Sequence, residues 1–236
     1  PDLVIHCAAE THVDRSITNP DSFVYGNIIG TCTLLEVSRE YFKKLNIEKK
    51  RNFVFHHIST DEVFGSLNDK GSFDESSKYA PNSPYSASKA ASDHLVRAWT
   101  KSYGLPSLIT NCSNNYGPYQ FPEKLIPLSI SKALNNENIL IYGDGSNVRD
   151  WLFVEDHVDA ILKVAKFGTL GNSYCIGGGS ERTNRELINF LCKKLDEKKQ
   201  SKTSYSSLIS YVEDRPGHDY RYSINCSKIK TELGWQ

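Results

Sequence analysis

Two apolar runs with a long helical stretch between them most constrain the fold of this chain. The runs cover residues 2–9 and 52–58, and each has the length of a buried strand. Residues 22–46 have the length of a helix, with turn residues at both ends. A strand, a helix and a second, parallel strand form a right-handed unit in almost all proteins. We therefore expect this part of the chain to build a parallel sheet.

Strands and helices continue to alternate along the rest of the chain. We expect strands over residues 106–112, 138–142, 149–154, 172–176 and 208–213, and helices over residues 85–103, 125–135, 155–167, 183–195 and 227–233. Polar segments separate them: loops over residues 10–16 and 68–84, and a charge-rich, solvated connector over residues 193–202. This alternation predicts an α/β protein with a mostly parallel sheet. The elements after about residue 113 are shorter, which suggests a second, smaller lobe.

The residues with the most chemistry follow the second apolar run. Ser59-Thr60-Asp61-Glu62 stands at the carboxyl end of a predicted strand, where ligands bind in open α/β sheets. Tyr85 and Lys89 lie four residues apart in a predicted helix and so share one face. A nearby ammonium favours the phenolate, so we expect Lys89 to lower the pKa of Tyr85 toward that of a general base.

Each of these features also has an ordinary explanation. Asp61-Glu62 alone suits a solvated turn after a strand, and Tyr85 with Lys89 alone suits a helix surface. Their order and spacing together are more specific than either pair.

Composition excludes several classes of protein. The 28 basic and 28 acidic residues cancel, which argues against nucleic acid as a partner. No apolar run approaches the length of a membrane span, so no membrane association is expected. The histidines have no partners at ligand spacing, so we expect no metal site. Free thiols in a reducing cytoplasm are favoured over disulfides for the six scattered cysteines, Cys7, Cys32, Cys112, Cys175, Cys192 and Cys226.

Seven sequence blocks in this order resemble the extended short-chain dehydrogenase/reductase family, and the Thr-Asp-Glu triplet resembles its nucleotide-sugar 4,6-dehydratases. The blocks cover residues 8–14, 59–65, 85–89, 113–118, 122–127, 149–151 and 214–219. The resemblance implies a Rossmann-like doubly wound parallel sheet, here incomplete, with a smaller α/β substrate-binding lobe. Residues 1–112 would belong to the NAD-binding domain, and residues 113–236 mainly to the sugar-nucleotide lobe, with residues near 150–170 returning to the first domain.

A dinucleotide-binding fold normally carries Gly-x-Gly-x-x-Gly after its first strand. This sequence has no such motif, since Gly143-x-Gly145 lacks the third glycine and Gly177-Gly178-Gly179 comes late in the chain. If the resemblance holds, we expect the chain to be a fragment that begins after the glycine-rich half and ends before the family's C-terminus. Family members also resemble homodimers that pack through helices like those over residues 22–46 and 85–103.

The implied reaction converts dTDP-glucose into a 4-keto-6-deoxy sugar, a precursor of rhamnose-type deoxysugars, with NAD as the cofactor. It oxidises C4, eliminates water across C5 and C6, and reduces C6. Tyr85 would take the proton of the 4-hydroxyl, and Lys89 would assist it and hold the nicotinamide ribose. Thr60 would bind the 4-keto oxygen, Glu62 would take the C5 proton, and a protonated Asp61 would donate to the departing 6-hydroxyl. Thymidine as the base rests on the resemblance alone.

The resemblance also implies binding residues on both sides of the site. NAD would contact Cys7, Ala8, Ala9, Glu10, Thr11, Ser59, Tyr85, Lys89 and Asn115. The sugar nucleotide would contact Thr11, Asn114, Lys124, Leu125, Ile126, Pro127, Tyr142, Arg149, Asn184, Arg215 and His218. Two alternatives stay open. A sugar-nucleotide 4-epimerase or decarboxylase would keep Tyr85 and Lys89 but generally lacks the acidic pair, and a non-catalytic NAD-binding protein usually loses Tyr or Lys.

Overall fold

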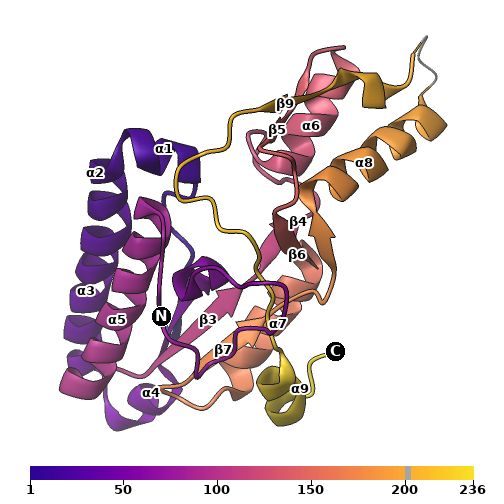
Figure 1. Cartoon of the computed structure of the whole chain (residues 1–236). Helices are drawn as coiled ribbons and strands as arrows, with labels where there is room; N and C mark the ends of the chain where they lie inside the picture. The colour runs from indigo at the N-terminus through magenta and orange to yellow at the C-terminus, as the bar shows by residue number, and fades with distance from the viewer. Residues whose placement is uncertain (200–202) are drawn as a thin grey trace.

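The centre of the protein is a parallel four-stranded sheet in the order β1-β2-β3-β7 (Figure 1). The computed structural model describes residues 1–199 and 203–236. The strands are β1 (Leu3–His6), β2 (Val54–Thr60), β3 (Ser107–Cys112) and β7 (Ser173–Ile176). Their pairing is parallel throughout, so the predicted α/β class with a Rossmann-type sheet is confirmed.

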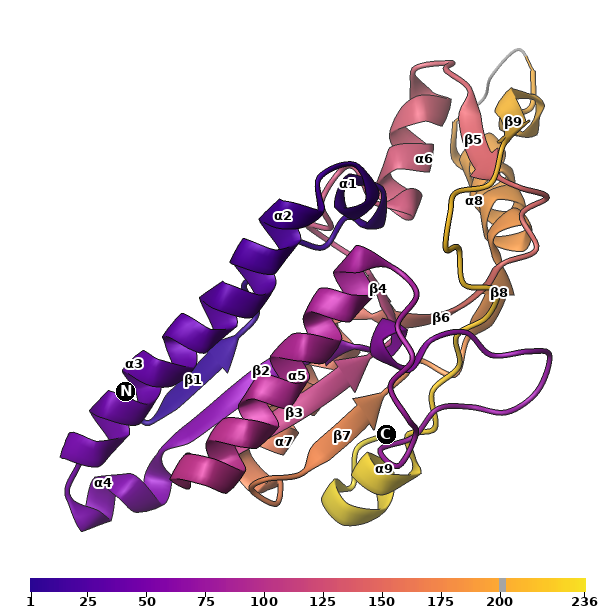
Figure 2. The ribbon, with the colours of Figure 1, turned by 60° about the vertical axis from the view of Figure 1, so that its left-hand side comes forward.

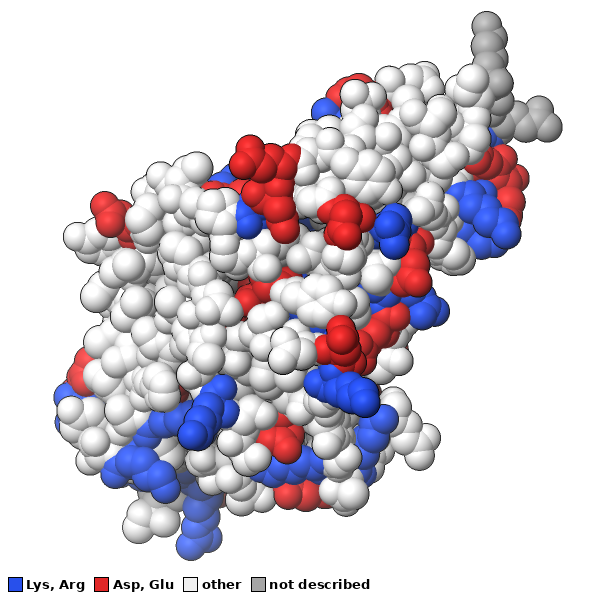
Figure 3. Space-filling model, in the orientation of Figure 1, with Lys and Arg blue, Asp and Glu red and all other residues white. Residues whose placement is uncertain are grey.

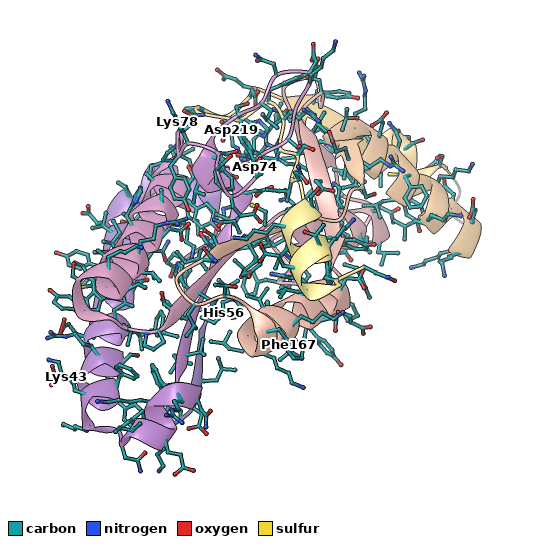
Figure 4. All side chains as sticks on the ribbon, turned by 90° about the horizontal axis from the view of Figure 1, so that it is seen from below. Lys43, His56, Asp74, Lys78, Phe167 and Asp219 are labelled. Carbon is teal, nitrogen blue, oxygen red and sulfur yellow. The ribbon has the colours of Figure 1, made fainter. Side chains whose placement is uncertain are left out.

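Helices cover both faces of this sheet (Figure 2). On one face lie α3 (Gly30–Lys44) and α5 (Pro84–Tyr103), and on the other lie α7 (Val154–Phe167) and α9 (Ser227–Leu233). Because neighbouring strand residues point to opposite faces, His57 faces the α5 layer and His56 the α7 layer. Both histidines are fully buried. Figure 4 shows His56 deep between the layers, while Lys43 lies at the outer end of α3.

The connection from β1 to β2 differs from the prediction at both ends. The expected polar loop over residues 10–16 contains a short helix, α1 (Val13–Thr18), which His12 caps. The expected helix over residues 22–46 is divided into α2 (Pro20–Phe23), a π-helical turn η1 (Val24–Ile29) and α3. Residues 47–52 form α4 (Ile47–Asn52), so the strand expected from residue 52 begins later. Period-based reasoning missed these turns because they are too short to show a hydrophobic repeat.

Helix α5 begins and ends where its sequence predicts. The Ser83 hydroxyl accepts a hydrogen bond from the Ser86 backbone N–H, the Ser86 hydroxyl accepts one from the Ser83 N–H, and Pro84 occupies the first turn. Gly104 ends the helix in the left-handed conformation, with φ of 67°. These signals fix the first turn of α5, which contains Tyr85, against the carboxyl end of β2.

The remaining elements form a smaller lobe with its own apolar core. It contains α6 (Leu125–Leu134), α8 (Asn184–Lys198), η3 (Tyr205–Leu208), and a parallel pair of β5 (Ile139–Tyr142) and β9 (Ile209–Val212). A third sheet, β4 (Asn114–Tyr116), β6 (Val148–Phe153) and β8 (Glu181–Thr183), lies between this pair and the main sheet (Figure 1). A capping box of Thr183 and Glu186 begins α8, close to the start of the helix expected over residues 183–195.

The predicted solvated connector over residues 193–202 is wrong for its first part, because α8 continues to Lys198. Leu195 packs on the lobe's core and extends the apolar face of the helix by another turn. Residues 200–202 lie outside the described residues. The chain also returns to the main sheet in β7 and α9, after it has built much of the smaller lobe. The domain division at residue 112 stays a prediction.

The surface carries both signs of charge. In Figure 3 acidic and basic side chains alternate over the visible face, and neither sign covers it. Figure 4 shows Asp74 and Lys78 on the long loop before α5, and Phe167 at the end of α7. Among the residues that the structure describes, no helix has both the length and the apolar character needed to cross a bilayer.

Gly65 fixes the turn that follows the acidic pair, which leads to a first prediction. Its φ of 87° and ψ of −155° suit only glycine, and an added Cβ would lie 2.4 Å from the Ala80 carbonyl oxygen. We expect Gly65→Ala to lower the free energy of unfolding by at least about 1–3 kcal/mol, measured by urea denaturation. Gly30→Ala is the matched control, since Gly30 is helical and open, and it should be neutral or stabilising. Equal effects of both substitutions would contradict this explanation.

Candidate active site

The acidic pair lies at the carboxyl end of β2, in the 3₁₀ turn η2 (Asp61–Phe64). The Thr60 hydroxyl caps this turn: it accepts from the Glu62 backbone N–H at 3.3 Å and donates to Asp61 Oδ1 at 3.2 Å. Asp61 is 1% exposed, and its Oδ2 has no hydrogen-bond partner among the described residues. Burial raises the pKa of Asp61 well above its usual value, and the charges of Glu62 and Asp150 add to this. These surroundings therefore favour the protonated form of Asp61.

Glu62 has a different environment from its neighbour. Burial raises its pKa, but the nearby guanidinium groups of Arg149 and Arg215 oppose this. The pKa values of both carboxyls are raised, that of Asp61 more strongly. At Glu62 the two guanidinium groups oppose the rise and Asp219 adds to it, whereas at Asp61 two carboxylates add to the rise and Arg149 opposes it. Environments that separate the pKa values of two acids are typical of sites where one acts as an acid and the other as a base.

Tyr85 and Lys89 project from the first turns of α5 toward the same end of the sheet. Lys89 is 4% exposed; its Nζ donates to the Ile58 carbonyl oxygen at 2.8 Å and lies 3.4 Å from His57 Nε2. The structure differs from the expectation that Lys89 lowers the pKa of Tyr85. Burial and the nearby Glu62 raise that pKa well above its usual value, and Thr60 opposes the rise only in part. Tyr85 is protonated at neutral pH in this structure.

A cavity of about 310 Å³ opens beside Glu62, within the range of small-molecule sites of ~300–1,000 Å³. The sequence-predicted residues that line it are Thr11, Glu62, Asn114, Lys124, Leu125, Tyr142, Arg149, Asn184, Arg215 and His218. These residues come from both lobes, so the fold brings together positions as far apart in sequence as Thr11 and His218. The remaining predicted contacts, Ile126 and Pro127, lie in the first turn of α6 and do not line this cavity.

Arg149 gives the cavity its clearest preference for an anion. The side chain is 6% exposed and donates only to backbone carbonyls, those of Val148, Asp219 and Tyr220. No ion pair of Arg149 with a carboxylate occurs among the described residues. Its guanidinium also lies 4.4 Å from the centre of the Tyr222 ring. A buried cation held by neutral groups stabilises a bound anion such as a phosphate.

Asp14 joins the two lobes at the mouth of the cavity. It accepts from Arg215 Nη1 at 2.9 Å and from the Tyr142 hydroxyl at 3.1 Å, and this lowers its pKa against the opposing effect of burial. A second link is the hydrogen bond from Lys124 Nζ to the Thr11 carbonyl oxygen at 2.7 Å. The α1 turn and the smaller lobe are therefore held together by charged side chains that also line the cavity.

Four residues that line the cavity have a buried atom without a hydrogen-bond partner among the described residues: Asn114 Oδ1, Trp151 Nε1, Asn184 Oδ1 and Arg215 Nε. Buried polar atoms are normally paired, so these are suited to a polar ligand. His218 Nδ1, by contrast, pairs with Asp214 Oδ1 at 2.6 Å.

The residues predicted to contact NAD, apart from Tyr85 and Lys89, lie after β1, at the end of β2 and in β4. Cys7, Ala8 and Glu10 are exposed along the carboxyl end of β1, Ala9 is half-buried, and Thr11 reaches the cavity. Ser59 is buried at the end of β2. The amide of Asn115 donates to the Ser113 carbonyl oxygen at 3.0 Å, and its Oδ1 lies 2.8 Å from His157 Nδ1. Small, exposed residues beside a lysine with a third donor suit a flat cofactor with ribose hydroxyls.

Sequence reasoning missed several residues of the site. Asn27, in the π-helical turn, is buried and bonds three groups: the Glu10 backbone N–H and carbonyl oxygen, and the Ser88 hydroxyl. It thereby fixes the segment after β1 against the turn that contains Lys89. Asp14 lies within the sequence block over residues 8–14, but the sequence predicted no role for it. Tyr222 was not predicted at all, because its contact with Arg149 depends on the tertiary fold.

A parallel sheet covered by helices on both faces, with Tyr85, Lys89 and an acidic pair at its carboxyl edge, defines a Rossmann-type α/β enzyme fold. The profile of the family described as GDP-mannose 4,6 dehydratase matches residues 1–236. The chain belongs to this family.

The curated relatives and solved structures agree with this membership. The chain is 55% identical to a dTDP-glucose 4,6-dehydratase of Salmonella typhimurium and 56% identical to one of Haemophilus influenzae. These alignments cover 100% of the chain but 68% and 71% of the relatives. A dTDP-glucose 4,6-dehydratase of Streptomyces venezuelae, solved with NAD and dTDP bound, has a TM-score of 0.89 at 46% identity, over 100% of this chain and 68% of that one. A UDP-glucuronic acid 4-epimerase of Bacillus cereus, solved with NAD and its sugar nucleotide, has a TM-score of 0.87 at 26% identity, over 100% and 70%.

The raised pKa of Asp61 predicts a pH-dependent effect on stability. A carboxyl whose pKa is raised by folding contributes stability below its unfolded pKa, and loses it as pH rises through the folded pKa. We expect Asp61→Asn to become more stable than the unsubstituted protein as pH rises from about 4 to about 8, by up to about 1.4 kcal/mol per pH unit. Urea denaturation across this range measures the difference. Asp156→Asn, at an exposed position on α7, is the control, and a similar trend in both would refute the assignment.

Proposed function

We propose that this protein converts dTDP-glucose into dTDP-4-keto-6-deoxy-glucose, as a hydro-lyase that uses NAD. The observation that carries the proposal is the pair of adjacent acids in different surroundings: burial favours the protonated form of Asp61, while two guanidinium groups lie near Glu62. Elimination of water requires one acid and one base. Identity above 50% to dTDP-glucose 4,6-dehydratases over the whole chain supports the same substrate. The product is a precursor for rhamnose-type deoxysugars.

NAD would lie along the carboxyl end of β1 and beside Lys89. The exposed segment from Cys7 to Thr11 would contact it, together with Ser59 and Asn115. Lys89 Nζ has one donor on the Ile58 carbonyl oxygen, and a further N–H would hold the nicotinamide ribose. When bound, NAD supplies the reversible two-electron chemistry that this reaction needs at C4 and C6 of the sugar.

The first proton transfer would belong to Tyr85. Its phenolic oxygen would take the proton of the sugar 4-hydroxyl, and that proton is not returned to the 4-oxygen, because C4 stays a ketone in the product. Burial disfavours the phenolate in this structure, so the ammonium of Lys89 must approach closely enough to stabilise it during the reaction. The Thr60 hydroxyl, which stands at the start of the same turn as the acidic pair, would donate to the 4-keto oxygen. A polarised ketone makes the C5 proton acidic.

Elimination would then divide between the two adjacent carboxyls. Glu62 lines the cavity and would remove the C5 proton as a carboxylate. Asp61 would donate its proton to the departing 6-hydroxyl, which leaves as water. The charges near each group favour the protonation state that its role requires.

The cations of the smaller lobe would bind the diphosphate. Arg149 is buried without a carboxylate partner, and Arg215, Lys124 and His218 line the same cavity. The unpartnered amide oxygens of Asn114 and Asn184 would accept hydrogen bonds from the sugar or the base. Leu125, Tyr142 and the backbone of residues 125–127 would add contacts to the nucleotide. We propose the boundary between NAD-binding and sugar-nucleotide domains near residue 112 on the same basis.

A direct test uses the intact protein with dTDP-glucose, and with UDP-glucose in parallel. We expect a 4-keto sugar, detected by its alkaline absorbance, without added NADH and with preference for the thymidine substrate. Interconversion with a 4-epimer, or loss of CO₂ from a uronate, would contradict dehydration. The protein would then share with the dehydratases only the C4 oxidation that uses Tyr85 and Lys89.

Asp61→Asn tests whether Asp61 is the acid of the elimination step. The amide keeps the size of Asp61 but cannot supply its proton, so elimination should fall by about 10²–10⁴-fold while C4 oxidation is retained. Single-turnover analysis would detect a nucleotide-bound 4-keto-glucose that keeps its 6-hydroxyl. Glu62→Gln is the companion variant and should in addition abolish exchange of the C5 proton with D₂O. Unchanged dehydration in Asp61→Asn would remove Asp61 from the reaction.

We further propose that the protein is a cytoplasmic homodimer. Six free thiols support a reducing compartment. The outer surface of η1 and α3 exposes Val24, Tyr25, Ile29 and Val37, at 44%, 71%, 50% and 63%. Apolar side chains gathered along one helical face are typical of a protein interface.

Val37→Asp tests the dimer. A charge at the centre of the helical interface should shift the protein toward monomer, measured by light scattering coupled to size-exclusion chromatography. Val158→Asp is the matched control, because Val158 is 48% exposed on α7, on the opposite side of the sheet. The dimer proposal fails in this form if Val37→Asp has the same mass as the unsubstituted protein at every concentration.

A further inference from the structure

A buried lysine needs a counter-charge, and Lys89 has none in direct contact. Its side chain is 4% exposed and contacts a backbone carbonyl oxygen and a histidine nitrogen. Among the described residues, no ion pair includes Lys89. Burial of an unpaired ammonium is costly, so a nearby carboxylate should compensate it.

Asp93 is placed to supply this charge. It lies four residues after Lys89 on α5, so the two side chains share one helix face, and it is fully buried. Asp93 Oδ2 accepts from the Tyr79 hydroxyl at 2.7 Å and from Asn111 Nδ2 at 3.1 Å. Asp93 Oδ1 faces His57 Nε2 at 3.3 Å. The carboxylate is thus held in one position from three different elements.

His57 stands between the two charges. The same nitrogen, Nε2, lies 3.4 Å from Lys89 Nζ and 3.3 Å from Asp93 Oδ1, while Nδ1 has no partner among the described residues. Lys89 Nζ lies within hydrogen-bond distance of Nε2, whereas Asp93 Oδ1 has no hydrogen-bond partner among the described residues. Because burial lowers the pKa of His57, an uncharged imidazole separates the ammonium from the carboxylate. The two charges therefore interact across the ring.

We propose that Asp93 is the counter-ion and positioning residue of Lys89 and acts through a neutral His57. The carboxylate keeps the lysine charged inside the protein, and the imidazole keeps the two groups apart, so that Lys89 Nζ stays on the Ile58 carbonyl oxygen at the edge of the sheet. The functional part of this inference rests on the proposed role of Lys89 beside Tyr85. The charge pairing itself does not depend on the reaction.

The other groups around the pair do not supply this charge near neutral pH. Burial lowers the pKa of His6 to about 4 and raises the pKa of Cys7, Cys112 and Tyr79, so all four are neutral. Arg97 is cationic but binds the Tyr79 hydroxyl and Ser173 Oγ, at 3.2 and 3.0 Å. Burial also lowers the pKa of Lys89 and of His57, and Asp93 opposes both shifts.

Asp93→Asn tests the charge without changing the shape of the side chain. Loss of the carboxylate should lower the pKa of folded Lys89 further, by about 1–3 units. A lysine whose pKa is lowered by folding destabilises the folded protein most at low pH, where the lysine is charged. This destabilisation decreases as pH rises through the pKa of the folded state. The urea midpoint of the variant should therefore lie furthest below that of the unsubstituted protein near pH 6, and approach it toward pH 10. The alkaline limb of the rate profile with dTDP-glucose should move to lower pH by the same amount.

Tyr79→Phe is the matched control, because it removes a donor to the same carboxylate without changing charge. Its effect on the urea midpoint should not vary over this pH range. Parallel pH profiles for Asp93→Asn and Tyr79→Phe would overturn the proposal and leave Asp93 a structural residue.

A double-mutant cycle tests the pairing of Asp93 with Lys89 without relying on Asp93→Asn alone. Lys89→Met leaves Asp93 uncompensated, whereas Lys89→Met with Asp93→Asn removes both charges. We expect the double variant to have a higher urea midpoint than Lys89→Met at pH 7, and additive losses would contradict the pairing. These unfolding measurements give an answer even if the protein does not dehydrate dTDP-glucose, so failure of the pairing and failure of the proposed function are distinguishable.

Discussion

The structure depends on the burial of ionisable groups at the carboxyl edge of a parallel sheet. Helices cover both faces of such a sheet, so side chains at the end of β2 and the start of α5 have little contact with water. An ammonium and two carboxyls in that position cannot all be charged without specific partners. The fold resolves this separately for each group: burial favours the protonated form of Asp61, two guanidinium groups lie near Glu62, and Lys89 donates to a carbonyl oxygen.

The smaller lobe completes the site by bringing cations to this edge. Arg149 donates to backbone carbonyls, so no carboxylate neutralises its charge and the guanidinium can bind an anion in the cavity. Arg215 is held differently, by Asp14 at the end of the first lobe. One cation thus supplies a fixed positive potential, while the other links the lobes whose relative position determines the shape of the cavity. A dianionic ligand bound between them would add to the contacts that hold the lobes together.

Much of this arrangement could be predicted from the sequence, and the exceptions have physical causes. The caps of α5, Ser83 and Gly104, are local signals, and the helix expected over residues 85–103 agrees with the structure to within one residue. The course of the chain between the lobes has no local signal, because β7 pairs with β3, 64 positions earlier, and α9 packs on β7 and α7. The protonation state of Tyr85 was also missed. The i, i+4 spacing shows that Lys89 is near, but it does not show that burial raises the pKa of Tyr85 by more than a nearby ammonium lowers it. The network from His57 to Asp93 was invisible for the same reason, since a histidine within an apolar run gives no indication of what packs above it.

The different surroundings of two consecutive acids follow from the geometry of the turn that contains them. In an extended strand, neighbouring side chains would face opposite sides of the sheet, and only one of them could reach the cavity. In an α-helix they would be about 100° apart on one exposed surface, with similar access to water. The 3₁₀ turn η2 lies at the boundary between strand and loop, and there Asp61 turns inward to 1% exposure while Glu62 lines the cavity. Thr60 stabilises this turn through the Glu62 N–H and bonds Asp61 Oδ1 with the same hydroxyl. A single side chain therefore fixes both the direction of the two carboxyls and the difference in burial that separates their pKa values.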